Sequence, residues 1–222
     1  MVWNIRLRSL TSKSQASCHV TLKGEIGIDM SKGTETRNRI IAKAAPLFNR
    51  KGYEGCTMQD IVEAVGLEKG SLYGHFPNKE ALAVAAFEYA WNETSSARMA
   101  KMDNIPNTIG KLKVHVANVV SLPSFDGGCP LLNAITDNDN GNPALRKMAR
   151  KALKEWRLYL QEIFKDGQDR GEIRAGLDPQ EAATLMIALL EGAMALDRID
   201  GRSGFLKGAG RHLNSYLDTV AS

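Results

Sequence analysis

The sequence predicts an all-α protein, in which a three-helix N-terminal domain with a helix-turn-helix precedes a larger helical domain. Three observations lead to this prediction. Apolar residues recur at intervals of three and four along most of the chain. Glycine, proline and capping residues divide these stretches into segments of helical length. At 222 residues, the chain is long enough to bury a core in each of two domains. We place the smaller domain at residues 34–80 and the larger at 81–222.

The first residues show no sustained periodicity and lack the apolar core of a signal peptide. We expect residues 1–33 to be a disordered or mis-assigned extension, with Met30 as the natural start. The alternative is a native basic arm that touches DNA.

The first helix is expected over residues 36–51. Ile40, Ala44 and Leu47 share one apolar face. Pro46 removes a hydrogen bond inside this segment, so we expect a slight kink there and no break. Gly52 then ends the helix.

Residues 52–79 are the most informative stretch, because they predict two short helices joined by a tight turn. Thr57 is a good N-cap, and Asp60 three residues later completes a weak capping box. Gly66 suits the left-handed conformation of a C-cap. A second short helix follows over residues 68–75.

In that second helix, Leu72 and Phe76 lie one turn apart and point inward, which leaves polar side chains outside. Gly70 and Gly74 each cost a helix about 1 kcal/mol relative to alanine, yet without a Cβ they let a partner approach closely. This is typical of a recognition helix in a DNA major groove. An ordinary surface hairpin is the alternative. The outward polar side chains are Lys69, Ser71, Tyr73 and His75.

Six further helices are expected over residues 78–102, 108–121, 130–136, 143–169, 179–196 and 204–220. Their starts carry clear signals, such as the Asp178 cap followed by Pro179. The 179–196 segment is apolar nearly all round, which indicates that another subunit covers one side. With the last helix it would form a four-helix dimer interface. The expected interface residues are Leu185, Leu189, Ala193, Leu196, Leu213 and Leu217.

The chain resembles the TetR family of transcriptional regulators. The resemblance runs from T-R-N-R-I-I-A-K-A-A-P-L-F through T-M-Q-D-I-V-E-A-V-G and K-G-S-L-Y-G-H-F to P-N-K-E-A-L. It implies a homodimer whose N-terminal domain binds a near-palindromic double-stranded DNA operator and whose C-terminal domain binds a small effector. Gly74 departs from the larger residue common in relatives, so the operator sequence stays open. The DNA contacts carried over are Thr57, Lys69, Gly70, Ser71, Tyr73, His75 and Lys79.

The effector pocket is expected among the helices of the larger domain, although an aromatic residue or methionine at helical spacing is more often plain core. G-G-C-P-L-L resembles a turn in a branch of the family whose members include regulators of electrophile or lipophilic-drug responses. Cys129 precedes a helix, where a thiol has a lowered pKa, so we consider a reactive sensor thiol against an inert buried cysteine. The pocket candidates are Phe87, Trp91, Met99, Met102, Cys129, Trp156 and Met186.

Composition narrows the function classes. The net charge is only +4, and this small excess lies toward the N-terminal third, which fits a DNA-facing module on a neutral body. No apolar run is long enough for a membrane span, and three cysteines without paired or metal-like spacing favour the cytoplasm. No catalytic constellation, cofactor motif or metal spacing is present in the sequence.

We therefore expect a ligand-responsive repressor and no enzyme. The alternatives are a transcriptional activator of the same fold, and a helical scaffold or small-molecule-binding protein that has lost DNA affinity.

Overall fold

The computed structural model describes residues 32–121, 125–136, 142–201 and 204–222. The described residues form helices and one isolated bridge between Ile173 and Ala221, in agreement with the all-α prediction. The expected extension and the Met30 start lie outside the described residues, except for Lys32 and Gly33. These two residues belong to the first helix, so the predicted boundary at residue 33 is corrected.

Three helices form the N-terminal part of the fold, and we call them the head: α1 (Lys32–Gly55), α2 (Met58–Val65) and α3 (Lys69–His75). Helix α1 is longer than expected at both ends, and Pro46 lies inside it. Its non-helical backbone lies at Gly52, whose φ of 74° and ψ of 171° mark a kink between two merged helical pieces. The predicted interruption at Gly52 therefore exists, but one more helical turn follows it.

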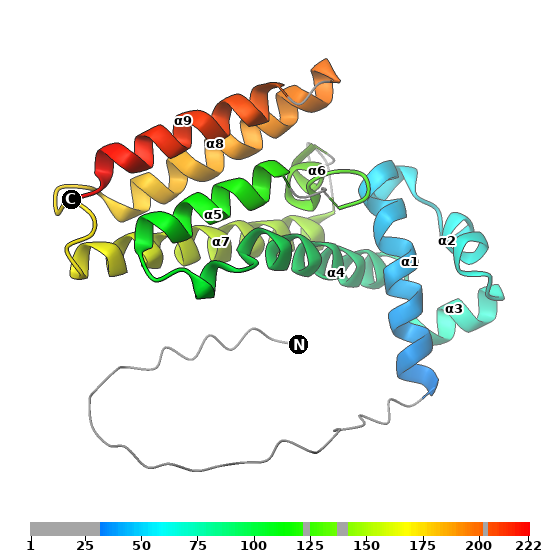
Figure 1. Ribbon diagram of the computed structural model, residues 1–222. Coiled ribbons are helices and arrows are strands. Elements are labelled where there is room, and N and C mark those ends of the chain that lie inside the picture. Colours follow the sequence, from blue (N-terminus) through cyan, green and yellow to red (C-terminus); the bar gives the residue numbers. More distant parts are fainter. Residues whose placement is uncertain (1–31, 122–124, 137–141, 202–203) are drawn as a thin grey trace, which may run out of the picture. The chain divides into compact units, whose positions relative to one another are not determined.

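The remaining helices form the body (Figure 1). They are α4 (Lys79–Met99), the short 3-10 helix η1 (Met102–Asn104), α5 (Thr108–Ser121), α6 (Pro130–Thr136), α7 (Pro143–Asp169), α8 (Pro179–Asp200) and α9 (Gly204–Val220). Figure 1 shows α8 and α9 side by side above α5 and α7, while α4 runs from the body to α1. None of the described helices is both long and apolar enough to cross a membrane.

Local caps explain most of these helix starts. The Asp178 carboxylate accepts hydrogen bonds from the backbone N–H groups of Gln180 and Glu181, at 2.7 and 3.1 Å. Asn78 caps α4 in the same way, through Ala81. The end of α4 differs from the expected residue 102, because Lys101 takes a left-handed conformation with φ of 65°.

Helix α4 contributes to two separate cores. Leu82, Ala86 and Ala90 pack in the core of the head, whereas Phe87 and Trp91 pack in the core of the body. The two sets alternate along one helix, because residues three and four apart share a face. A boundary at residue 80 therefore leaves out three side chains that complete the head.

His115 is a fully buried titratable group in the body core. Its Nε2 accepts a hydrogen bond from Trp156 Nε1 at 3.2 Å, so the proton of the neutral ring lies on Nδ1. Nδ1 lies 3.1 Å from the backbone carbonyl oxygen of Arg98 and donates to it. Burial, with a smaller contribution from the charge of Arg98, lowers the pKa of His115 to about 3.

Acid is expected to destabilise the fold through this histidine. Between pH 6.5 and about 3 the unfolded chain takes up a proton at His115 that the native state does not. The free energy of unfolding therefore falls on acidification, by at most about 1.4 kcal/mol per pH unit from this group. In His115→Gln, which does not titrate, chemical denaturation should show a shallower pH dependence than in the wild type. Parallel curves for the two proteins would contradict the assignment.

Candidate nucleic-acid interface and effector region

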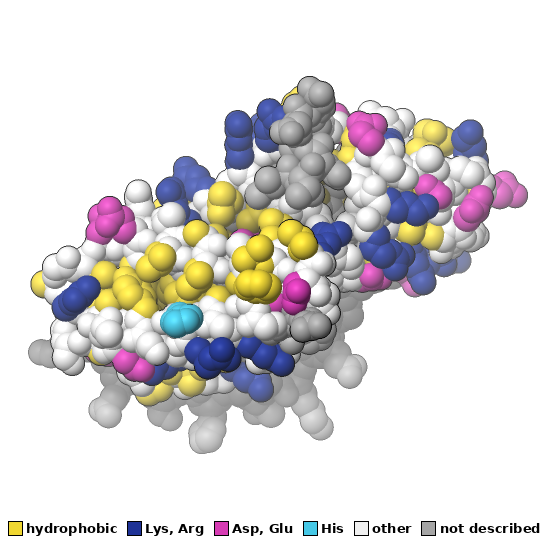
Figure 2. All heavy atoms as spheres, turned by 90° about the horizontal axis from the view of Figure 1, so that it is seen from above, with side chains coloured by type: hydrophobic (Ala, Val, Ile, Leu, Met, Phe, Trp, Pro, Cys, Tyr) yellow, Lys and Arg dark blue, Asp and Glu magenta, His cyan; other side chains and the backbone are white. Residues whose placement is uncertain are grey.

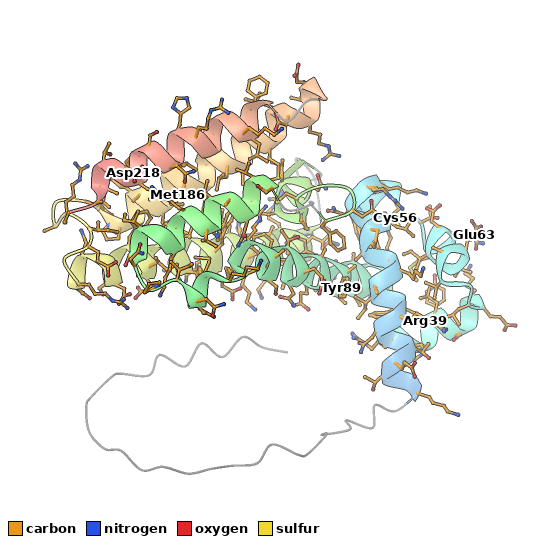
Figure 3. The ribbon with its side chains drawn as sticks, in the orientation of Figure 1. Arg39, Cys56, Glu63, Tyr89, Met186 and Asp218 are labelled. Atoms are coloured by element: carbon orange, nitrogen blue, oxygen red, sulfur yellow. The ribbon has the colours of Figure 1, made fainter. Side chains whose placement is uncertain are left out.

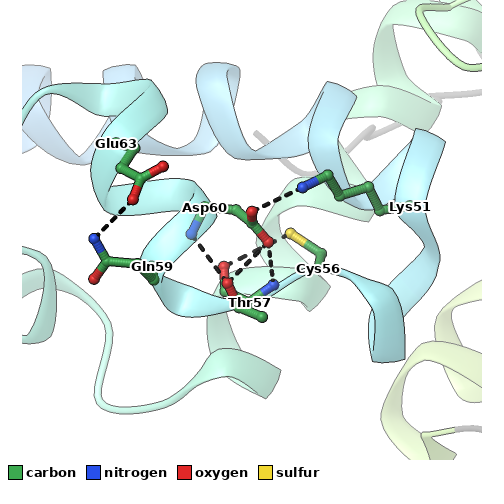
Figure 4. Close-up of polar contacts among 6 residues, drawn as sticks. All are labelled: Lys51, Cys56, Thr57, Gln59, Asp60 and Glu63. Atoms are coloured by element: carbon green, nitrogen blue, oxygen red, sulfur yellow. Dashed lines mark hydrogen bonds and ion pairs between the residues drawn. The ribbon is translucent and has the colours of Figure 1, made fainter.

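The capping box at the start of α2 is formed as the sequence predicts (Figure 4). The backbone N–H of Asp60 donates to Thr57 Oγ1 at 3.1 Å, and the backbone N–H of Thr57 donates to Asp60 Oδ2 at 2.8 Å. Lys51 donates to Asp60 Oδ1 at 2.7 Å, which fastens α2 to the end of α1. This hydrogen bond from Lys51, followed by those from Thr57, lowers the pKa of Asp60 to about 2.

Helix α3 is held by its apolar side and presents its polar side. Leu72 and Phe76 have almost no exposed surface, whereas Tyr73 is 43% exposed. The guanidinium of Arg37 stacks over the Phe76 ring at 4.6 Å. The ammonium of Lys79 lies 4.3 Å from the ring centroid of Tyr53. Both cations are therefore oriented by aromatic rings of the head.

Gly70 and Gly74 lie on the exposed side of α3. A Cβ added at either position would meet no protein atom within 4 Å. Packing within the protein therefore does not require glycine at these positions, although each weakens the helix. The open space on this side of α3 fits the predicted close approach of a partner.

The seven residues expected to contact DNA lie at the N-cap of α2, along α3 and at the start of α4. Five of them are exposed, while His75 and Lys79 are partly buried. Exposed cations of α1 were not among these predictions, and Figure 3 shows one of them, Arg39, on the head. The T-R-N-R segment that holds Arg37 and Arg39 was recognised only as part of the family resemblance. Helical periodicity does not show which exposed side chains face a partner.

The expected effector residues lie in packed core. Phe87, Trp91, Trp156, Met186 and Cys129 belong to the body core, and Met99 packs against it. Met102 is buried beside Tyr159, whose hydroxyl lies 4.0 Å from its sulfur. The structure therefore brings most of the set together, as core side chains.

The prediction of a lowered thiol pKa at Cys129 is wrong. The thiol is buried, and this burial raises the pKa of Cys129 to about 11, although the nearby Arg98 charge opposes the shift. Its Sγ donates a hydrogen bond to Glu191 Oε1 at 3.3 Å. Desolvation of the thiolate outweighs the favourable helix terminus, so Cys129 is a protonated core residue.

A buried polar cluster around Arg98 was missed by the sequence reasoning. Arg98 Nη1 donates to Glu191 Oε1 at 2.9 Å, and Arg98 Nη2 donates to Cys129 Sγ at 3.2 Å. Its guanidinium carbon also lies 4.4 Å from the ring centroid of Trp156. The available signal was Glu191, a single charge within the apolar A-L-L-E-G-A-M-A-L segment.

Side-chain amides join the head to the body. Asn49 of α1 donates to the carbonyl oxygens of Asp126 and Gly128, at 2.8 and 2.9 Å. Asn133 of α6 donates back to the carbonyl of Asn49 at 2.9 Å and accepts from Arg198 of α8. Both amides also line a hollow of about 40 Å³, to which one effector candidate, Phe87, contributes.

An apolar surface covers α8 and the start of α9, and Figure 2 shows hydrophobic side chains gathered in a band over this face. Of the predicted interface residues, Leu185, Leu189 and Leu196 are exposed on it. Ala193, Leu213 and Leu217 are instead buried within the chain. These three have almost no surface left for a second subunit to cover, so their assignment to the interface is corrected.

Comparisons with known proteins match both parts of the fold. The family model described as "Bacterial regulatory proteins, tetR family" matches residues 40–86, and the model described as "Tetracyclin repressor-like, C-terminal domain" matches residues 109–213. The HTH-type transcriptional regulator LmrA of Bacillus subtilis (strain 168) is 31% identical, over 75% of this chain and 88% of LmrA. The HTH-type transcriptional repressor DhaR of Mycobacterium sp. (strain GP1) is 26% identical, over 75% of this chain and 84% of DhaR.

A solved structure gives the same result. The crystal structure of a TetR transcriptional regulator from Chloroflexus aurantiacus J-10-FL superposes with a TM-score of 0.82. Its sequence is 39% identical, and the match covers 86% of this chain and 98% of that protein. The likeness therefore extends across the head and the body.

Replacing Gly70 by alanine is expected to separate stability from binding. Gly70→Ala should raise the free energy of unfolding by about 0.5–1 kcal/mol, because the new methyl group meets open space and alanine favours the helix. The same methyl group should weaken binding to duplex DNA if α3 enters a groove. Chemical denaturation and electrophoretic mobility shift measure the two effects.

Gly208→Ala in α9 is the matched control, since a Cβ there meets only the Arg211 side chain, at 3.9 Å. It should raise stability without weakening DNA binding. Equal DNA affinity for Gly70→Ala and the wild type would show that α3 is not closely approached at this position.

Proposed function

Because this chain belongs to the tetR family of bacterial regulatory proteins, we propose that it represses transcription as a homodimer that a small-molecule effector releases from a near-palindromic operator. Family membership makes the chain a DNA-binding transcriptional regulator and not an enzyme. Repression, the operator, the dimer and the effector are the proposed parts. The single observation that carries the proposal is the exposed polar side of α3, which two buried anchors hold in place.

The chemistry of α3 supports contact with a DNA groove. Lys69, Ser71 and Tyr73 are exposed and supply an ammonium and two hydroxyl groups, which can bind phosphate oxygens or base edges. Gly70 and Gly74 leave room between these side chains for the partner's backbone or bases. In helix-turn-helix proteins the second helix of the pair enters the major groove, and α3 has that position here.

The exposed face of α8 supports a homodimer. Leu185, Leu189, Gly192, Leu196 and Ile199 follow one another at spacings of four, three, four and three residues, which places them on one stripe. Ile199 is 83% exposed, and a Cβ at Gly192 would meet nothing within 4 Å. A second copy of α8 would cover this stripe and approach closely at Gly192. Two heads related by a two-fold axis would then require a near-palindromic site.

Coupling between effector and DNA requires an element shared by body and head. Helix α4 is such an element, because its side chains complete both cores. The amide contacts of Asn49 and Asn133 form a second connection. An effector that binds more tightly to one orientation of the head would shift the population toward it. The raised pKa of Cys129 removes the support for an electrophilic effector, so a lipophilic one is proposed.

Removal of one cation from α3 is expected to weaken DNA binding. Lys69→Ala should lower affinity for the fragment upstream of the protein's own gene by roughly tenfold. It should also make that affinity less dependent on salt, because a protein with one phosphate contact fewer releases fewer counterions from the DNA when it binds. Fluorescence anisotropy at two salt concentrations measures both effects.

Lys147→Ala is the matched control, since Lys147 is also an exposed lysine and lies on α7. It removes the same charge from the body and should leave both quantities unchanged. An equal effect of the two substitutions would point to net charge alone and would remove α3 from the interface.

A charge on the α8 stripe is expected to separate the subunits. Leu185→Lys, at a position 46% exposed in the single chain, would bury an ammonium in the interface. Light scattering should show a monomer or a strongly weakened dimer. Leu153→Lys, on α7 and 39% exposed, is the control and should remain a dimer. A dimer of unchanged affinity in Leu185→Lys would place the interface elsewhere.

A further inference from the structure

Arg98 is a buried cation at the end of the helix that joins the head to the body. Its side chain is 7% exposed, and that of its ion-pair partner Glu191 is 13% exposed. Burying a guanidinium and a carboxylate costs free energy that the pair recovers only with good geometry and further hydrogen bonds. A contribution to the free energy of unfolding therefore does not by itself explain why an otherwise apolar core contains this buried ion pair.

Two tryptophan rings lie beside the guanidinium. The Arg98 guanidinium carbon lies 4.4 Å from the Trp156 ring centroid and 5.6 Å from the Trp91 ring centroid. The two ring centroids are 5.9 Å apart and the ring planes are inclined by 59°. Aromatic faces attract positive charge, and they do so more strongly when water is excluded. Together the rings form an angled aromatic site that is now filled by a cation of the same chain.

One carboxylate oxygen of Glu191 accepts no hydrogen bond from the described residues. Its Oε1 accepts from both Arg98 and Cys129, at 2.9 and 3.3 Å. Its Oε2 is buried and has no hydrogen-bond partner among the residues that the structure describes. A buried carboxylate oxygen without a donor is costly, and it would be satisfied by an incoming N–H group or by a positive charge.

We propose that Trp91, Trp156 and Glu191 form the recognition site for an organic cation with an apolar substituent, and that Arg98 occupies this site in the absence of the cation. The inference rests on the proposed function, since it names the chemical class of the effector. The cation would take the place of the guanidinium between the rings and the carboxylate, and Arg98 would leave the site.

The chemistry favours a cation over an anion. An anion would have to displace Glu191 from Arg98, and it would then face the negative surface of two aromatic rings. It would also leave both oxygens of a buried carboxylate without the guanidinium. A cation instead keeps the charge balance of the site, because it replaces one positive group by another.

Departure of Arg98 would act directly on α4. The backbone carbonyl of Arg98 accepts from His115 and from Asn118, and Asn118 also donates to the carbonyl of Ala100 at 2.8 Å. The chain then turns through the left-handed Lys101. The end of α4 is thus held by its backbone to α5 and by the Arg98 side chain to α8. Release of the second attachment lets this end move against α8 while α5 still holds it.

The decisive experiment uses phenylguanidinium as the probe and phenylurea as its uncharged isostere. In Arg98→Ala the site is vacant, and fluorescence of the two core tryptophans should report saturable binding of phenylguanidinium with at least tenfold preference over phenylurea. In the wild type the cation competes with Arg98, so binding should be saturable but about ten- to a hundredfold weaker. Circular dichroism checks that each variant is folded.

Glu191→Gln with Arg98 retained is the second variant, and it guards against a loss of folding in Arg98→Ala. It keeps the shape of the side chain and removes the charge, so cation affinity should fall at least tenfold. Equal binding of phenylguanidinium and phenylurea, or an unchanged affinity in Glu191→Gln, would overturn the site. So would a lack of binding to the wild type at a hundred times the dissociation constant of Arg98→Ala.

DNA binding is measured by anisotropy in the same wild-type samples, at saturating phenylguanidinium. Release of DNA is expected. Cation binding without release would overturn the effector role. Failure of the wild type to bind DNA in the absence of cation would instead count against the proposed function, and the fluorescence titration would still decide the cation site by itself.

Discussion

The charge of Arg98 needs partners, because a guanidinium taken out of water without them would cost several kcal/mol. Its partners come from elements that are distant in the sequence: Glu191 from α8, Cys129 from the segment before α6, and Trp156 from α7. The Arg98 side chain therefore connects the end of α4 to three other parts of the body, in addition to the backbone contacts of this end with α5. Hydrogen bonds and ring contacts have direction, so this cluster selects one arrangement of helices where apolar packing alone would accept several.

Directional contacts also connect the Arg98 cluster to the head. Cys129 lies at the end of a loop whose Gly127 is so close to α1 that a Cβ there would lie 2.9 Å from the carbonyl carbon of Asn49. Asn49 then binds the loop carbonyls, and Asn133 connects it to Arg198 near the end of α8. Few residues separate the buried ion pair from the surface of α1. A rearrangement at Arg98 can thus change the contacts that orient the head, without a long intervening path.

Features that depend on nearby residues, such as helix starts, were predicted well from the sequence. Features that depend on distant residues, such as the burial of a side chain or its place in an interface, were not. Asp178, Asn78 and Thr57 cap their helices as expected, because a cap binds backbone groups two or three residues away. Leu213 and Leu217 looked like interface residues because periodicity shows an apolar face but not which neighbour covers it. The error at Cys129 has the same origin. Its position before a helix was readable, whereas its burial depends on helices that meet it only in the folded chain.

The exposed side of α3 was more predictable than the buried cluster around Arg98. Its residues lie within one short stretch, and the anchors Leu72 and Phe76 determine which side of α3 faces outward. The Arg98 cluster joins residues up to 93 positions apart. A single sequence does not show which lone charges meet, so Glu191, a single charge in an apolar segment, does not indicate its partner.

The sharing of α4 between two cores sets a rule for protein engineering. A chimaeric regulator made by joining the head of one relative to the body of another at residue 80 would combine Leu82, Ala86 and Ala90 from one parent with α1 from the other. The new head would then have mismatched packing although every helix was intact. A functional exchange must carry the head-facing side chains of α4 with the head and leave Phe87 and Trp91 as the body requires. The head and the body are therefore divided between two faces of α4, and no single cut in the chain separates them.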